Sequence, residues 1–144
     1  MYEPIRTKSV HTTAAAPQIP HRSREEELDI RLATQLTALL TVTDELHALA
    51  TRADGAAADG AALAAAAERI AEQVARLSGG HYPLRAEPTD GGAASRAAAL
   101  HQRAHTLAGN ALALATTRND TAVTALAVER MAAHAAPLRD LATA

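Results

Sequence analysis

The segment from residue 32 to residue 50 reads LATQLTALLTVTDELHALA. Its leucines and small residues recur at steps of four and three, at Leu32, Leu36, Leu39, Thr43, Leu46 and Ala50. Such steps place about one side chain per turn on the same face of an α-helix. The segment therefore predicts a long amphipathic helix that packs this face against other helices.

The start of this helix is marked by a capping box. Ser23 and Glu26 match the S-x-x-E pattern, in which each side chain accepts a hydrogen bond from the other residue's backbone N–H. The glutamates at 25–27 lie where the helix dipole favours negative charge. We expect the helix to run from about residue 24 to residue 52.

The same spacing recurs in three later segments and predicts helices at about 61–77, 93–118 and 120–136. Their expected packing faces are Leu63, Ala67, Ile70, Val74 and Leu77; Leu100, Ala104, Leu107, Ala111 and Leu114; and Val123, Ala127, Met131, His134 and Leu138.

Turn residues separate these segments. Asp59 is expected to cap the second helix, and Gly79-Gly80 to end it. Asn119-Asp120 is typical of a helix end followed by a new N-cap, although one unbroken helix over 93–135 is an alternative. Pro137 is expected to kink or stop the last helix near Ala136.

These elements predict an all-α fold, a single alanine-rich four-helix bundle over 23–144. Mostly short connections favour up-down-up-down antiparallel order. The exception is the segment 78–92, which is either functional or disordered, or has the length needed to cross the bundle end diagonally. Residues 1–22 contain three prolines and no helical periodicity, and are expected to form an extended or disordered tail.

Composition excludes several classes of function. The 144 residues include 39 alanines and no cysteine, which removes disulfides, thiolate nucleophiles and cysteine-bound zinc. A net charge of −2 gives no reason to expect nucleic acid or an anionic membrane as partner. No apolar run is long enough for a bilayer, so we expect a cytoplasmic protein. Thirteen arginines against one lysine suggest a high-GC bacterial genome.

Catalytic motifs are missing from the sequence. None of the four serines lies in G-x-S-x-G, and neither Gly-Gly pair is followed by the lysine of a phosphate-binding loop. Two tyrosines are the only aromatic residues other than histidine, which leaves little to stack on a cofactor. The sequence predicts a protein that is not an enzyme and has no cofactor.

Four histidines form the one candidate constellation for a metal or small ligand: His47, His101, His105 and His134. His101 and His105 lie one helical turn apart, and His134 falls on the packing face of the last helix. Two observations argue against a metal. The sequence has no Glu-x-x-His motif, and four glutamates of the helices are expected to point outward: Glu45, Glu68, Glu72 and Glu129. The alternative is that His134 is a neutral core histidine, bonded to a carbonyl or to a side chain of the 93–118 helix.

Two pairs of arginines repeat every seven residues, Arg69 with Arg76 and Arg96 with Arg103. Such a row can clasp an acidic partner helix, or it can be a solvated face. Both interpretations remain open at the level of the sequence.

The leading prediction for function is a non-enzymatic helical adaptor or regulatory protein that binds another protein. The expected contact residues lie in the tail: Tyr2, Ile5, Arg6, Lys8 and Val10. They suit an extended peptide docked on a partner's sheet edge or groove. A homo-oligomer through the last helix is a further possibility, since its apolar residues spread round much of its circumference. The alternative function is a four-helix bundle that binds a metal or small ligand through its histidines.

Overall fold

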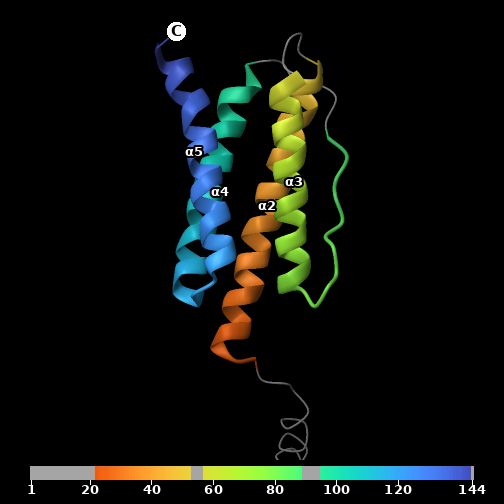
Figure 1. The fold of residues 1–144 in the computed structure, drawn as a ribbon, viewed down its shortest axis with the longest axis vertical. Helices are drawn as coiled ribbons and strands as arrows, with labels where there is room; N and C mark the ends of the chain where they lie inside the picture. The colour runs from red at the N-terminus through yellow and green to blue at the C-terminus, as the bar shows by residue number, and fades with distance from the viewer. Residues whose placement is uncertain (1–21, 53–56, 89–94, 144) are drawn as a thin grey trace, which may run out of the picture.

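The computed structural model describes residues 22–52, 57–88 and 95–143. Four helices account for most of them: α2 (Arg24–Arg52), α3 (Ala57–Leu77), α4 (Arg96–Arg118) and α5 (Thr121–Thr143) (Figure 1). The described residues contain no strand. The predicted all-α four-helix bundle is confirmed.

The predicted helix ends are built from the expected local contacts. The Ser23 backbone N–H donates to Glu26 Oε1 at 2.8 Å, and the Glu26 N–H donates to Ser23 Oγ at 3.1 Å, which completes the capping box. Asn119 takes the left-handed conformation, with φ of 60°. Asp120 Oδ1 then accepts from the Val123 N–H at 3.1 Å. Helices α4 and α5 are therefore separate, and the unbroken-helix alternative is excluded.

Two helix bounds differ from the prediction. Helix α3 begins at Ala57, so Asp59 lies inside its first turn instead of capping it. Helix α5 contains Pro137 and continues to Thr143. Proline removes one backbone hydrogen bond of the helix and crowds the preceding turn, but its own φ angle is helical. No glycine or second proline follows between Pro137 and Thr143 to end the helix. The helix therefore passes through Pro137, so a stop near Ala136 is wrong, while the alternative of a kink there stays a prediction.

The order of helix directions differs from up-down-up-down. Helix α2 packs against α3 and α4, and α4 packs against α5. Figure 1 shows α2 and α5 running one way and α3 and α4 the other, so each of these packed pairs is antiparallel. The chain achieves this in up-down-down-up order because residues 78–88 return along the length of α3 before α4 begins.

The returning segment is tied to the bundle through one arginine. Arg85 Nη2 lies 2.7 Å from Asp44 Oδ1 on α2, and Arg85 Nη1 lies 2.8 Å from Glu68 Oε2 on α3. Gly79 and Gly80, with φ of 70° and 92°, make the turn out of α3. The described part of the connection is thus a strap along α2 and α3, and it does not simply cross the bundle end.

The core follows the predicted helix faces. Fully buried side chains from all four helices meet in it, including Leu32, Leu36, Ile70, Ala108 and Val123. Buried Thr43 satisfies its hydroxyl by donating to the Leu39 carbonyl at 2.7 Å. On α4 the face is mostly alanine, which lets this helix approach its neighbours closely.

Helices α3 and α5 face each other mainly through ion pairs. Arg69 Nη1 lies 2.7 Å from Glu129 Oε1, and Arg76 Nη2 lies 2.7 Å from Asp120 Oδ2. The two arginines on α3 therefore pair with carboxylates of the same chain, Glu129 on α5 and Asp120 just before it. Across the described ranges, none of the helices has the length and apolar character needed to cross a membrane.

Candidate functional site

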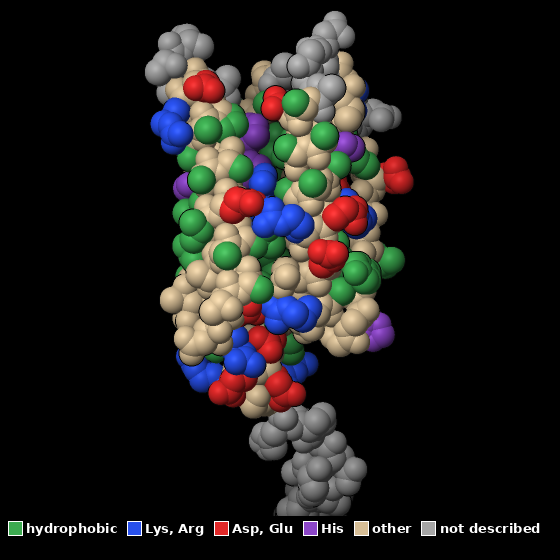
Figure 2. All heavy atoms as spheres, in the orientation of Figure 1, with side chains coloured by type: hydrophobic (Ala, Val, Ile, Leu, Met, Phe, Trp, Pro, Cys, Tyr) green, Lys and Arg blue, Asp and Glu red, His purple; other side chains and the backbone are tan. Residues whose placement is uncertain are grey.

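A pocket opens at one end of the bundle, where α2 ends and α3 begins. Its volume is about 580 Å³, and all four helices contribute to its lining. In Figure 2 it is the hollow between α3 and α5, with histidine and basic side chains at its floor. We call it the end pocket. Its lining comprises Leu46, Leu49, Ala50, Arg52, Asp59, Ala62, Leu63, Ala97, His101, Arg130, Ala133, His134 and Pro137.

The pocket exists because each helix presents an alanine at this level of the bundle. Ala50, Ala62, Ala97 and Ala133 come from α2, α3, α4 and α5 respectively. A methyl group does not reach the bundle axis, so four of them at one level leave space that leucines would fill. Leu46, Leu49 and Leu63 make the rest of the wall apolar.

Arg130 is the unexpected polar residue in this apolar setting. Only 7% of its surface is exposed. Its Nη1 lies 3.6 Å from Glu129 Oε1, and its Nη2 lies 3.4 Å from His134 Nε2. Among the described residues, its Nε has no hydrogen-bond partner. A buried cation is costly without a well-placed partner, and these contacts are long. The pocket floor therefore carries a positive charge that the protein compensates only in part.

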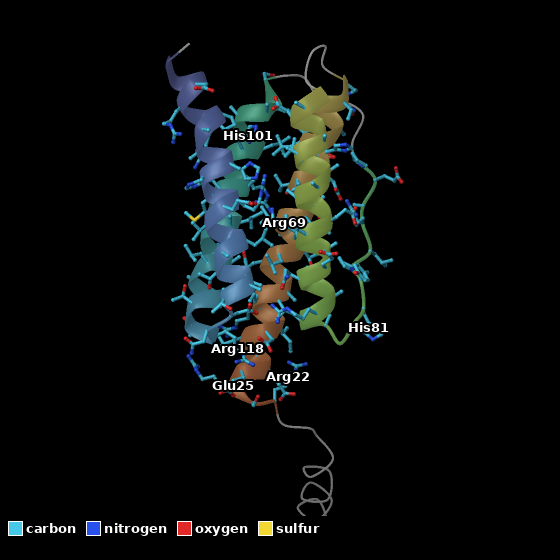
Figure 3. The ribbon with its side chains drawn as sticks, viewed as in Figure 1. Arg22, Glu25, Arg69, His81, His101 and Arg118 are labelled. Atoms are coloured by element: carbon cyan, nitrogen blue, oxygen red, sulfur yellow. The ribbon has the colours of Figure 1, made fainter. Side chains whose placement is uncertain are left out.

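His134 and His101 lie together beside this arginine. Their Nδ1 atoms are 3.0 Å apart, and the two rings are tilted at 48° with centroids 5.2 Å apart (His101 is labelled in Figure 3). Since a guanidinium only donates, His134 Nε2 must accept from Arg130. Neutral His134 then carries its proton on Nδ1 and donates it to His101 Nδ1. The three residues form a chain of hydrogen bonds, in which Arg130 donates to His134 and His134 donates to His101.

Burial and neighbouring charge keep both histidines neutral. Burial, then the charges of Arg130, His101 and His105, lowers the pKa of His134 to about 3. Burial and Arg130 also lower the pKa of His101, against a smaller opposing effect of Asp59. Burial lowers the pKa of Arg130 itself, which still stays charged at neutral pH.

The structure brings together two of the four histidines predicted for a metal or ligand. His101 and His134 meet in the end pocket, and His134 is 1% exposed, as expected for a core position. His105 is half-buried on α4 and acts on His134 through its charge. His47 is half-buried on α2 and does not line the pocket. Within the described ranges, no three metal-ligating side chains gather in one group.

The predicted glutamate orientations hold for most positions. Glu68, Glu72 and Glu129 are exposed. Glu45 is not: its side chain is 13% exposed, and its Oε1 lies 3.5 Å from Arg96 Nη2. Glu45 lies outside the packing face predicted for α2, but α4 packs against α2 there. The side chain of Glu45 therefore lies at the contact between these two helices.

The burial of Arg130 was not predicted from the sequence. Met131 was expected on the packing face of α5, but Met131 is half-buried and Arg130 is buried. Spacing alone could have found it, because residues 123, 127, 130 and 134 also follow steps of four, three and four. The charge of arginine argued against that choice. The predicted partner-binding residues Tyr2, Ile5, Arg6, Lys8 and Val10 lie outside the described residues.

Comparison of the chain with protein-family models, with curated proteins and with solved structures finds no match.

Proposed function

We propose that this protein is a non-enzymatic four-helix bundle that binds a small organic molecule in the end pocket. The observation that carries this proposal is the lining: apolar side chains surround a floor formed by a buried arginine and two histidines. Small-molecule sites typically combine mostly apolar walls with a few convergent polar groups.

The size of the pocket supports the same function. Its volume of about 580 Å³ falls within the range of about 300–1,000 Å³ that is usual for ligand sites. Sites between the helices of a bundle are also a common place for a bound molecule. A bundle of this length gains little by leaving such a space open, because each unfilled apolar volume costs stability.

Binding fits the chemistry of the lining better than catalysis does. The described residues that line the pocket include no hydroxyl or thiol to act as a nucleophile. The two histidines bond to each other, and His134 also accepts from Arg130. Among the residues that the structure describes, neither histidine is hydrogen-bonded to a carboxylate that would orient it as a general base, as catalytic histidines usually are.

A metal is the other ligand that the histidines suggested. The 3.0 Å separation of the two Nδ1 atoms is the feature in its favour. The adjacent charge of Arg130 opposes it, since a second cation at this site would be repelled. We therefore rank an organic ligand above a metal.

The test is a titration of the purified protein with decanol, a neutral apolar probe, followed by calorimetry and thermal unfolding. We expect saturable binding and a higher melting temperature, because a ligand that binds the native state stabilises it. In Ala97→Phe the new ring fills the pocket, so binding should be lost. Ala99→Phe, at an exposed position on the same helix, is the matched control and should bind as the wild type does.

Three results would contradict the proposal. They are no saturable binding of decanol or decanoate to the wild type, equal loss in both phenylalanine variants, or a rise in melting temperature with Zn²⁺ that His134→Gln removes. The last result would favour the metal-binding function.

The adaptor function predicted from the sequence remains a proposal. Its support among the described residues is the strap, where Tyr82 and Leu84 are exposed, the latter to 97%. Exposed apolar residues are often contact points for a partner. Affinity capture with the full chain and with a version lacking residues 1–22 would separate a tail-dependent partner from one bound by the bundle.

A further inference from the structure

The environment of Arg130 defines what kind of molecule the end pocket suits. Its guanidinium is more than nine-tenths buried and lines the pocket, and its Nε–H has no hydrogen-bond partner among the described residues. An unsatisfied buried donor on a charged group is expensive. A negatively charged ligand group beside this guanidinium would compensate its charge.

The protein's own carboxylates do not fill this role. Glu129 is half exposed, and its Oε1 lies 2.7 Å from Arg69 Nη1 but 3.6 Å from Arg130 Nη1. Asp59 lines the pocket from the exposed first turn of α3. The closer partner of Glu129 is therefore Arg69, and within the described part of the chain Arg130 has no short ion pair.

The histidine pair reinforces the preference for an anion. Arg130 donates to His134, and His134 donates to His101, so the polar floor presents donors and one full positive charge. Of the charged groups around it, Arg52 lines the pocket from α2. A cationic head group would meet Arg130 directly, and a neutral one would leave its charge uncompensated.

We propose that the ligand is an amphipathic monocarboxylate, with its carboxylate on Arg130 beside the His101–His134 pair and its apolar body against the alanine and leucine walls. This inference rests on the proposed function and adds the head group to it. A planar carboxylate matches the fork of a guanidinium, and its single charge matches the single buried arginine. A phosphate monoester would bring a second charge, for which the nearest further cation on the lining, Arg52, is exposed.

The test compares ligands that share one tail: decanoate, decanol, decylamine and decyl phosphate, each below its micelle concentration. We expect decanoate to bind at least about tenfold more tightly than decanol, since a charge-assisted hydrogen bond in a buried site exceeds a neutral one. Decylamine should not bind. Decyl phosphate should bind more weakly than decanoate.

The matched variants are Arg130→Met, which replaces the guanidinium by an unbranched apolar side chain, and Arg103→Met, which removes an exposed arginine from α4. Arg130→Met should bind decanoate no better than decanol. Its melting temperature without ligand should rise, because a poorly paired buried charge is replaced by an apolar group. Arg103→Met should keep the wild-type preference for decanoate.

Each remaining outcome has a defined meaning. Equal affinity for decanoate and decanol would overturn the head-group inference and leave the proposed function standing. Binding of none of the four compounds would defeat the proposed function itself. Tighter binding of decyl phosphate would replace the carboxylate with a dianion. A lower melting temperature in Arg130→Met would show that the arginine serves the fold, and would overturn the inference.

Discussion

The two ends of this bundle contain similar residue types but are packed differently. In the half that contains the start of α2, large buried side chains such as Leu32, Leu36 and Val123 fill the space between the helices. In the half that contains the end of α2, alanines from four helices leave the end pocket, with Arg130 and His134 at its floor. We call these the packed half and the pocket half.

The comparison shows that alanine has two roles in this chain. In the packed half, Ala108, Ala111 and Ala115 of α4 are fully buried, because the helices approach closely enough for their methyl groups to make contact. In the pocket half, Ala62 and Ala133 line open space. Alanine therefore allows close packing in one half and leaves a pocket in the other. The difference depends on the side chains of the facing helices.

The largest expected effect comes from creating a cavity in the packed half. Leu36→Ala removes a side chain with 0% exposure, and should lower the free energy of unfolding by about 2–5 kcal/mol. Leu63→Ala, on the partly open wall of the end pocket, should cost about 1 kcal/mol, since less contact is lost. Urea denaturation of both variants measures the difference, and equal losses would mean that the two halves are packed alike.

Acid should destabilise the fold through His134, which lines the end pocket. His134 has a pKa of about 3 in the folded protein against an ordinary value of 6.5, so between these values the unfolded chain binds a proton that the folded one does not. Stability is therefore fully present above about pH 6.5 and falls as the pH decreases, by at most about 1.4 kcal/mol per pH unit. Thermal unfolding across this range measures the slope.

The control for this prediction is His134→Gln, which removes the titrating group. It should retain only the smaller slope from His101, whose pKa is lowered in the same direction. The lowered pKa of Asp120 acts only below its ordinary value of 3.8, outside the upper part of the range. Arg130, His105, Asp59 and Glu129 surround this site in both proteins. An unchanged slope in His134→Gln would mean that His134 is not buried in its neutral form.

A smaller effect is expected at the turn that joins α4 to α5. Asp120 caps α5 through the Val123 N–H and pairs with Arg76 of α3. Asp120→Ala should lower the free energy of unfolding by about 1–2 kcal/mol, through loss of both contacts. Asp120→Asn keeps the cap and loses the charge, so its cost should be below about 1 kcal/mol. Chemical denaturation distinguishes them, and a larger loss in the asparagine variant would contradict this account.

Local features of the fold were predictable from sequence because their causes are local. Ser23 with Glu26 and Asn119 with Asp120 satisfy helix ends through contacts within a few residues. Burial of Leu32, Leu36 and Leu39 follows from their spacing. The position of His134 on a packing face followed from the same argument.

The direction of α4 and the character of the site depend on contacts between distant segments. The path of the strap is fixed by Arg85, which meets Asp44 and Glu68 across 41 and 17 residues of sequence. Periodicity does not reveal such pairs. The burial of Arg130 was not predicted for a related reason. Charged residues are rarely buried, so spacing alone does not assign an arginine to a packing face. Its position beside the end pocket is the feature that accounts for its burial.

The most direct test of the central claim, that the pocket half is a ligand site, uses isotope-labelled alanine methyl groups observed by NMR during titration with decanoate. We predict saturable shifts at Ala50, Ala62, Ala97 and Ala133, which line the end pocket, and little change at Ala108, Ala111 and Ala115 in the packed half. Shifts spread evenly over both groups, or none in the first group at saturating decanoate, would contradict the account.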